Sequence, residues 1–231
     1  MMKLYDYYRS SASYRVRIAL HLKNIDFETI PVDLLAGDHK NKDYKAHNPQ
    51  GLVPLLVEGD NELGQSLAIM EYLDETYPEP LLVSGTALDK AYIRQMALLV
   101  ACEIHPMNNP KVWKAYVGGK LGADEKQMQD WYHFWILDGL AAYEALLIKY
   151  QKAGAFTCGD TPSMADLYLI PQLYNARRFN VDLQAFSKIR AIELNAIKLD
   201  AFQKAAPEAQ ATAPADMPAI HGAKSPLLQP S

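Results

Sequence analysis

The hydrophobic pattern of this 231-residue chain changes near residue 80, and this change constrains the fold more than any other feature. Before it, segments with the two-residue period of a strand alternate with segments of helical spacing. After it, every periodic segment is helical. Pro78-Glu79-Pro80 and Ser84-Gly85 form a short linker between the regions. We therefore predict a small α/β domain over residues 1–80 and an all-helical domain over residues 87–204.

The first region follows the order strand, helix, strand, short helix, hairpin and helix. Gly59-Asp60-Asn61 is turn chemistry and joins the two strands of the hairpin. Ser66 precedes the last helix as its expected N-cap. This order predicts a mixed sheet covered by helices. The expected strands lie at 3–7, 27–32, 54–58 and 62–64, and the expected helices at 14–23, at 42–46 and from 67 onward.

The second region contains several helices and is followed by a tail of different composition. Ser163-Met164-Ala165-Asp166 is typical of a capping box at the start of a buried helix. Residues 205–231 are rich in Ala and Pro with little periodicity, so we expect a tail that is disordered or draped over the surface. The expected helices lie at 87–117, which Pro106 and Pro110 can divide in two, and at 124–150, 163–178 and 186–202.

Charge and composition exclude several classes of protein. Lys and Arg number 23 against 27 Asp and Glu, so the formal net charge of −4 gives no global attraction to nucleic acid. No apolar run approaches the roughly 20 residues that span a bilayer, so we expect no membrane partner. Met1 to Arg9 lacks a long apolar core after its lysine, so we expect no secretory signal. The six histidines show no metal-ligand spacing, so we expect no metal.

The two cysteines form no disulfide framework, and a reduced, cytoplasmic setting is the simplest interpretation. Cys102 lies in an apolar segment and is expected to be a core thiol. Cys158 lies in an expected loop and has no CxxC partner. A sulfur reaction at this protein would therefore need a thiol from outside the chain.

The junction between the first strand and the first helix is the first candidate site. Arg9-Ser10-Ser11 occupies this junction. In α/β sheets, ligands tend to bind at such junctions between the end of a strand and the start of a helix. Free N–H groups and the positive end of the helix dipole favour an anion there, and serine hydroxyls can donate to a thiolate and lower its pKa. The alternative is that Ser10 and Ser11 only cap the helix.

Four further segments could contribute to binding. Val53-Pro54 opens a strand, and a cis peptide there would expose the Val53 backbone to a peptide-like ligand. Gln65-Ser66 marks a second helix N-terminus and a second anion site. Arg177-Arg178 ends a helix and could bind a carboxylate if turned into a cleft, although a solvated helix end is the alternative. His105 and Asn108 flank an irregular helical point, which is either a capped kink or a polar pocket wall.

The run from Tyr8 to Leu20 resembles the Ser-Ser-Cys-x-x-Arg-Val-Arg-Ile-Ala-Leu motif of zeta-class glutathione transferases. The resemblance extends from Lys3 to Phe202 and implies a thioredoxin-like α/β domain followed by an all-α domain, the glutathione transferase architecture. Supporting segments are Asn48-Pro49-Gln50, Val53-Pro54, Gln65-Ser66-Leu67-Ala68-Ile69, Gly159-Asp160, Ser163-Met164-Ala165-Asp166, Pro171-Gln172, Arg178-Phe179 and Val181-Asp182-Leu183.

This resemblance implies an activity. The best-known zeta-class members use glutathione as a cofactor to isomerise maleylacetoacetate to fumarylacetoacetate in tyrosine and phenylalanine breakdown, and a homodimer is implied as well. Thiolate addition makes the cis double bond single, the chain rotates, and elimination leaves the trans isomer. The implied site residues are Ser10 with Ser11 for the thiolate, Val53-Pro54 for the glutathione backbone, Gln65 and Ser66 for its γ-glutamyl end, His105 and Asn108 for the cleft wall, and Arg9 and Arg178, with Arg177 as a third, for substrate carboxylates.

Two departures from the family pattern bear on the substrate. Ala12 stands where many members carry Cys, which affects only activities that use that cysteine. The maleylpyruvate-isomerising branch follows its His-Pro-x-Asn-Asn segment with arginines, whereas Pro110-Lys111 follows here, with Lys111 as a substitute point charge. This favours maleylacetoacetate. The alternatives are maleylpyruvate, a general transferase of other electrophile specificity, and a non-catalytic binding module.

Overall fold

A computed structural model describes residues 1–229 and separates into two compact units. One unit contains Met1–Leu82 together with the described residues from Ile197 onward. The other contains Val83–Ala196. The division expected from the sequence placed residues 197–204 in the helical domain, so the contacts group the C-terminal residues differently.

The first unit is built on a mixed four-stranded sheet, as the sequence predicted. Its strands lie in the order β2-β1-β3-β4. β1 is parallel to β2 and antiparallel to β3, and β4 closes the hairpin with β3. The bounds are β1 Met2–Asp6, β2 Phe27–Pro31, β3 Leu55–Glu58 and β4 Asn61–Gly64.

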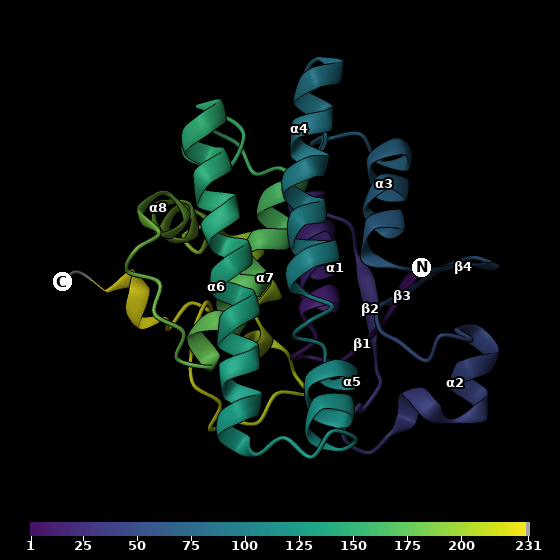
Figure 1. Ribbon diagram of the computed structural model, residues 1–231. Coiled ribbons are helices and arrows are strands. Elements are labelled where there is room, and N and C mark those ends of the chain that lie inside the picture. The colour runs from purple at the N-terminus through teal and green to yellow at the C-terminus, as the bar shows by residue number, and fades with distance from the viewer. Residues whose placement is uncertain (230–231) are drawn as a thin grey trace. The chain divides into compact units, whose positions relative to one another are not determined.

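Helices α1 (Ser11–Leu22) and α3 (Ser66–Thr76) pack against each other in this unit, and the short α2 (Lys42–His47) follows the 3₁₀ turn η1 (Asp38–Lys40) (Figure 1). The prediction that Ser66 is the N-cap of α3 was wrong, because Gln65 is the N-cap and Ser66 is the first helical residue. The core side chains are fully buried apolar groups, among them Leu4, Ile18, Leu20 and Ile69.

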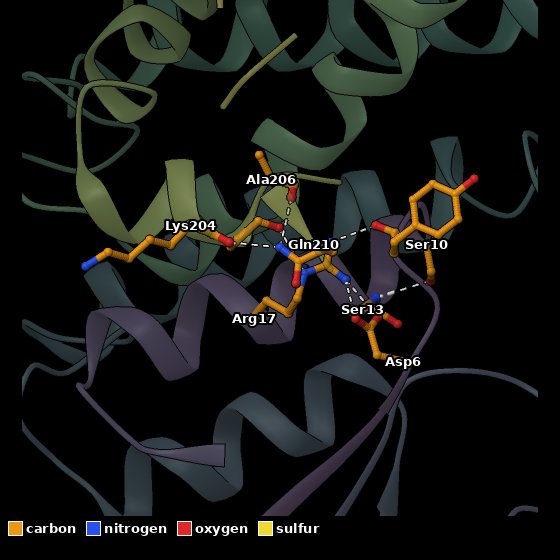
Figure 2. Close-up of polar contacts among 9 residues, drawn as sticks. Asp6, Ser10, Ser13, Arg17, Lys204, Ala206 and Gln210 are labelled. Carbon is orange, nitrogen blue, oxygen red and sulfur yellow. Dashed lines mark hydrogen bonds and ion pairs between the residues drawn. The ribbon is translucent and has the colours of Figure 1, made fainter. Parts of the chain in front are cut away.

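Two arginines of α1, Arg15 and Arg17, are buried in the first unit. Arg17 is fully buried, and its Nη1 lies 2.7 Å from Asp6 Oδ1 (Figure 2). Its other donors reach two backbone carbonyls, with Nη2 2.9 Å from Tyr8 O and Nε 2.9 Å from Ala205 O. Buried charge is tolerated here because every side of the guanidinium meets an acceptor.

The C-terminal segment is ordered on the first unit. Helix α9 (Asp200–Ala205) packs against α1, and Tyr14 Oη donates to Phe202 O at 3.3 Å. The 3₁₀ turns η4 (Pro207–Ala209) and η5 (Pro226–Leu228) follow. The carboxylate of Glu208 accepts the backbone N–H groups of three consecutive residues, 220–222, at 2.6–2.7 Å. The expected tail at 205–231 therefore lies against the surface in its described part, and it is not disordered there.

The second unit is helical throughout its named elements, as predicted. Helix α4 packs against α7, while α6 packs against the π-helix η2 and against α8 (Figure 1). Asp166 Oδ2 accepts the Ser163 N–H at 2.8 Å, which confirms the capping box of α7. The bounds are α4 Ala87–Leu98, η2 Leu99–Ile104, α5 Pro110–Val112, π-helix η3 Trp113–Gly118, α6 Glu125–Tyr150, α7 Met164–Arg178 and α8 Ser187–Ala196.

The expectation that Cys102 is a core thiol was wrong, because Cys102 is exposed on η2. The π-helical turn changes which residues face the core, and the regular spacing assumed for this segment does not hold there. Among residues 1–229, no helix is long and apolar enough to cross a membrane.

Candidate active site

The register of the sheet brings the first unit's candidate residues to one edge. Tyr5, near the end of β1, pairs with Leu55 at the start of β3, and Leu55 pairs with Gly64 at the end of β4. Three chain segments therefore leave or enter the sheet at this edge. They are Arg9-Ser10-Ser11 after β1, Val53-Pro54 before β3, and Gln65-Ser66 after β4.

Ser10 is the N-cap of α1. Its Oγ accepts the Ser13 backbone N–H at 3.2 Å (Figure 2). Its carbonyl accepts the Tyr14 N–H at 2.8 Å. A hydroxyl has one donor and two acceptor sites, so this cap leaves the Ser10 O–H able to donate. Ser10 is half-buried and Ser11 is buried. The capping role and the thiolate-donor role expected for Ser10 are therefore compatible.

Arg9 lies against two tyrosine rings. Its Nη2 donates to Tyr7 Oη at 3.3 Å, and its Cζ lies 5.9 Å from the Tyr7 ring centroid and 5.6 Å from that of Tyr8. Burial raises the pKa of Tyr7 to about 12, and a hydrogen bond with Tyr8 adds to the shift. Tyr7 is therefore a neutral phenol at neutral pH, and it can orient the guanidinium through its oxygen and ring.

The N-terminus of α3 carries strained backbone and an added positive charge. Gln65 has φ 65° and ψ 114°, a left-handed-side conformation that non-glycine residues rarely adopt. Its Nε2 donates to Gln50 Oε1 at 2.9 Å. Arg15, buried on α1, donates from Nη1 to Ser66 Oγ at 3.3 Å. The local sequence pattern indicates no role for Arg15 or Gln50, because only the fold brings them to this helix end.

The Val53-Pro54 peptide is cis. Val53 is buried in a small cluster with Tyr7, Val32 and Tyr44, which fixes the segment just before β3. Pro54 precedes the first ladder residue, Leu55, so it removes no hydrogen bond from the interior of the sheet.

The second unit places its four candidates differently from one another. Asn108 is buried, and its Nδ2 donates to the Tyr132 carbonyl at 3.1 Å. His105 is half-buried at the end of η2, where its backbone N–H bonds to the Val100 carbonyl at 2.9 Å. The amide of Asn108 therefore links the segment after η2 to helix α6.

Arg177 and Arg178 are adjacent but have different surroundings. Arg177 Nε donates to Glu193 Oε1 at 2.7 Å, and its Nη2 reaches the second oxygen of that carboxylate. The Glu193 side chain is 0% exposed and that of Arg177 is 26% exposed, so this bidentate pair is structural. Arg177 is therefore already bound to a protein carboxylate rather than open to a substrate carboxylate. Arg178 is exposed, with its Cζ 4.8 Å from the Phe179 ring centroid.

The residues fit an anionic peptide-like cofactor better than a metal. The edge of the first unit offers two helix N-termini, the buried Arg15 guanidinium and the Gln65 amide. Within residues 1–229 no cluster of His, Cys, Asp and Glu could hold a metal ion. Burial raises the pKa of the Cys158 thiol, which disfavours its thiolate. The donor set therefore suits an anionic peptide-like thiol such as glutathione.

A thioredoxin-like sheet with a serine-capped first helix, followed by a helical unit, is the arrangement of a glutathione transferase. The family described as "Glutathione S-transferase, N-terminal domain" matches residues 4–81. A maleylpyruvate isomerase of Ralstonia is 46% identical over 90% of this chain and 98% of its own. A maleylacetoacetate isomerase of Pseudomonas aeruginosa is 46% identical over 93% of this chain and 100% of its own.

Solved structures agree with these relatives. A maleylpyruvate isomerase described as a bacterial zeta-class transferase is 45% identical, with a TM-score of 0.89 over 92% of this chain and 100% of that one. A maleylacetoacetate isomerase of Methylobacterium extorquens, solved with malonate and glutathione, is 38% identical, with a TM-score of 0.88 over 92% of this chain and 99% of that one. This chain belongs to the zeta class of the glutathione transferase family.

Proposed function

We propose that this protein is a glutathione-dependent cis–trans isomerase that converts maleylacetoacetate to fumarylacetoacetate. The observation that carries the proposal is the Ser10 cap, which leaves a hydroxyl able to donate at the start of α1, with the ring-held Arg9 as its neighbour in the chain. A thiolate site next to a carboxylate site is what this reaction needs. Relatives named for this reaction and a glutathione-bound isomerase structure support the proposal.

Glutathione would be held by the edge of the first unit. We assign its backbone to Val53-Pro54 and its γ-glutamyl end to Gln65 and Ser66. The strained backbone of Gln65 and the buried contact from Arg15 to Ser66 support this assignment, because both fix the start of α3 as an anion site. We also assign His105 to contact the bound ligand. Asn108 instead bonds the segment that follows η2 to the Tyr132 carbonyl.

The chain's own residues stabilise charge at defined atoms. When bound, glutathione supplies the thiol that adds to the alkene and leaves again after rotation. Ser10 Oγ donates a hydrogen bond that lowers the pKa of this thiol, and Ser11 assists at the same helix end. Arg9 and Arg178 together bind a substrate carboxylate and so fix the alkene for attack.

Maleylpyruvate is the second candidate substrate. The identity to the Ralstonia maleylpyruvate isomerase is 46%, the same as to the Pseudomonas maleylacetoacetate isomerase. Pro110-Lys111 in place of arginines is the sequence feature that favours maleylacetoacetate. A general transferase would not need the guanidinium of Arg9 held over two rings, since an apolar electrophile has no carboxylate to bind.

We further propose that the enzyme is a cytoplasmic homodimer. Helix α6 exposes an apolar row at helical spacing, with Phe134 59%, Leu137 37% and Ile148 54% exposed. Such a row is typical of a surface that a second copy covers. The molecular mass in solution tests this assembly.

The first experiment is an isomerisation assay with maleylacetoacetate and maleylpyruvate side by side, with and without glutathione. We expect fast turnover that depends on glutathione. Ser10→Ala should lower kcat by about 100-fold or more while glutathione affinity changes little, and Ser10→Thr, which keeps a hydroxyl and a cap, should retain most activity. Unchanged kcat in Ser10→Ala would remove the thiolate assignment. Absence of turnover on both substrates, with glutathione bound, would replace the isomerase by a transferase of other specificity.

A further inference from the structure

Three aromatic rings of the second unit form a cluster that we call the aromatic platform: Trp113, Tyr132 and Phe179. Phe179 is at its centre. Its ring centroid lies 4.1 Å from that of Tyr132 and 5.6 Å from that of Trp113, which it meets at 90°. Trp113 and Tyr132 also meet directly, at 5.2 Å between centroids. Trp113 and Tyr132 are buried, so the platform is a fixed part of the helical unit.

Two cations lie against this platform. Arg178 Cζ lies 4.8 Å from the Phe179 centroid, and Lys114 Nζ lies 5.0 Å from the Trp113 centroid. Both side chains are exposed, and the ammonium of Lys114 is open to a solute. Ring faces attract cations and restrict the motion of otherwise flexible side chains. The platform therefore holds two positive charges in one region of the surface.

The charge of Lys114 is not neutralised by the protein itself. Within residues 1–229 its ammonium forms no ion pair with a carboxylate, whereas Lys126 and Lys152 each pair with an aspartate. An ammonium that is held on a ring and lacks a carboxylate partner is suited to bind one from a ligand. Arg178 is the residue already proposed to bind one substrate carboxylate.

Lys111 is the competing candidate, because it directly follows Pro110 where the related branch carries arginine. It lies on the short α5, three residues before Lys114, and it is exposed. The ring contact of this segment is made by Lys114, so the structure favours Lys114 over the residue that the sequence suggested.

We infer that Lys114 is a specificity-determining residue that binds the second carboxylate of a long dicarboxylate substrate, while Arg178 binds the first. The inference rests on the proposed function for the identity of the substrate. Dicarboxylates are the acids whose two ends can use two separate cations, and the M. extorquens structure was solved with malonate, a dicarboxylate. A monocarboxylate can use only one of the two.

Calorimetric titration of the glutathione-loaded full chain with pimelate, a long saturated dicarboxylate, and with hexanoate tests this inference without turnover. Lys114→Gln should weaken pimelate binding about five- to tenfold and hexanoate binding less than twofold. Lys114→Arg, which keeps the charge, should bind pimelate about as well as the wild type. The difference in pimelate affinity between the wild type and Lys114→Gln should shrink in high salt because the site is exposed. Lys120→Gln, which alters another exposed lysine of the same unit, is the matched control.

The outcomes separate this inference from the proposed function. An equal response of Lys114→Gln and Lys120→Gln would overturn the role of Lys114, and so would a loss found in Lys111→Gln instead. If the wild type isomerises neither substrate but its pimelate affinity depends on Lys114, the role of Lys114 in carboxylate binding stands and the isomerase assignment fails. If the wild type isomerises maleylacetoacetate and Lys114→Gln leaves KM unchanged, the isomerase assignment stands and the role of Lys114 fails.

Discussion

Arg9 differs from an ordinary surface arginine because its guanidinium is held before any substrate arrives. The Tyr7 hydroxyl and the Tyr7 and Tyr8 rings fix it next to Ser10 in the chain. Binding then costs less side-chain entropy than it would for a free arginine. Tyr7 therefore acts on the substrate through Arg9 and is a positioning residue.

Tyr7→Phe keeps the ring and removes the oxygen that accepts from Arg9. We expect KM for the dicarboxylate substrate to rise about threefold, with kcat within a factor of two, because one neutral hydrogen bond is worth little. Steady-state kinetics measure both constants. Tyr116→Phe, on an exposed tyrosine, is the control. A large fall in kcat at constant KM would instead place the Tyr7 hydroxyl at the reacting atoms.

The local sequence pattern indicates the helix starts at Ser10 and at Gln65-Ser66, but it does not indicate the two arginines that are buried on α1. Helix starts have local signals. The burial of Arg15 and Arg17 has none, since a charged residue is buried only where distant groups pair with it. Those groups are Ser66 for Arg15, and Asp6 and the Ala205 carbonyl for Arg17. Neither pairing has a signature in the local pattern.

At the scale of elements, the start of α4 depends on the charge of one carboxylate. Asp89 accepts from the Thr86 N–H at 3.0 Å in a capping box and pairs with Lys152. The Lys152 hydrogen bond, followed by those from Thr86, lowers the pKa of Asp89 from 3.8 to about 2. A carboxylate with a lowered folded-state pKa stabilises the fold above its ordinary pKa, and this stabilisation disappears as pH falls through the folded-state value.

We therefore expect wild-type stability to contain an Asp89 contribution that is complete above about pH 4 and disappears toward pH 2. Thermal unfolding of the wild type and Asp89→Asn across this range measures it. The Tm difference between them should be largest at neutral pH and should narrow below pH 4. A Tm difference that stays constant from pH 6 to pH 2 would contradict the lowered pKa.

The contact between α6 and η2 requires a residue without a side chain. A Cβ at Gly139 would lie 2.2 Å from Ile104 Cγ1, at the end of the π-helix that precedes His105. Gly139→Ala should lower the free energy of unfolding by about 2–3 kcal/mol, which is typical of overpacking. Urea denaturation measures this loss. Adding Ile104→Ala removes the clashing atoms, so the double variant should lose less than the sum of the two single changes.

Periodicity predicted the order of the elements, but it could not predict where helices change type. The region expected as one or two helices over 87–117 contains two π-helical segments, η2 and η3. Their hydrogen-bond pattern arises from packing against neighbours such as α6, and no residue type in the sequence signals it. The capping residues Thr86, Asp124 and Ser163, by contrast, are local signals at helix starts.

At the scale of the whole molecule, the chain returns to its first unit after the helical one. Residues from Ile197 onward group with Met1–Leu82, and α9 supplies the carbonyls that Tyr14 and Arg17 bond. The amide of Gln210 continues the contact within the segment, since its Nε2 donates to Lys204 O and Ala206 O (Figure 2). The α/β unit is therefore assembled from both ends of the chain, and truncation before residue 197 would expose α1.

Glu208 bonds two parts of this C-terminal segment to each other. One of its carboxylate oxygens accepts the N–H groups of residues 220, 221 and 222. Charge-assisted bonds of this kind are stronger than neutral ones, and their loss leaves three donors without this acceptor.

Glu208→Ala should raise amide hydrogen exchange at 220–222 about tenfold or more while leaving residues 83–196 unchanged. Glu75→Ala, an exposed change on α3, should alter neither region. Equal loss of protection in both units of Glu208→Ala would show that the segment instead supports the stability of the entire chain.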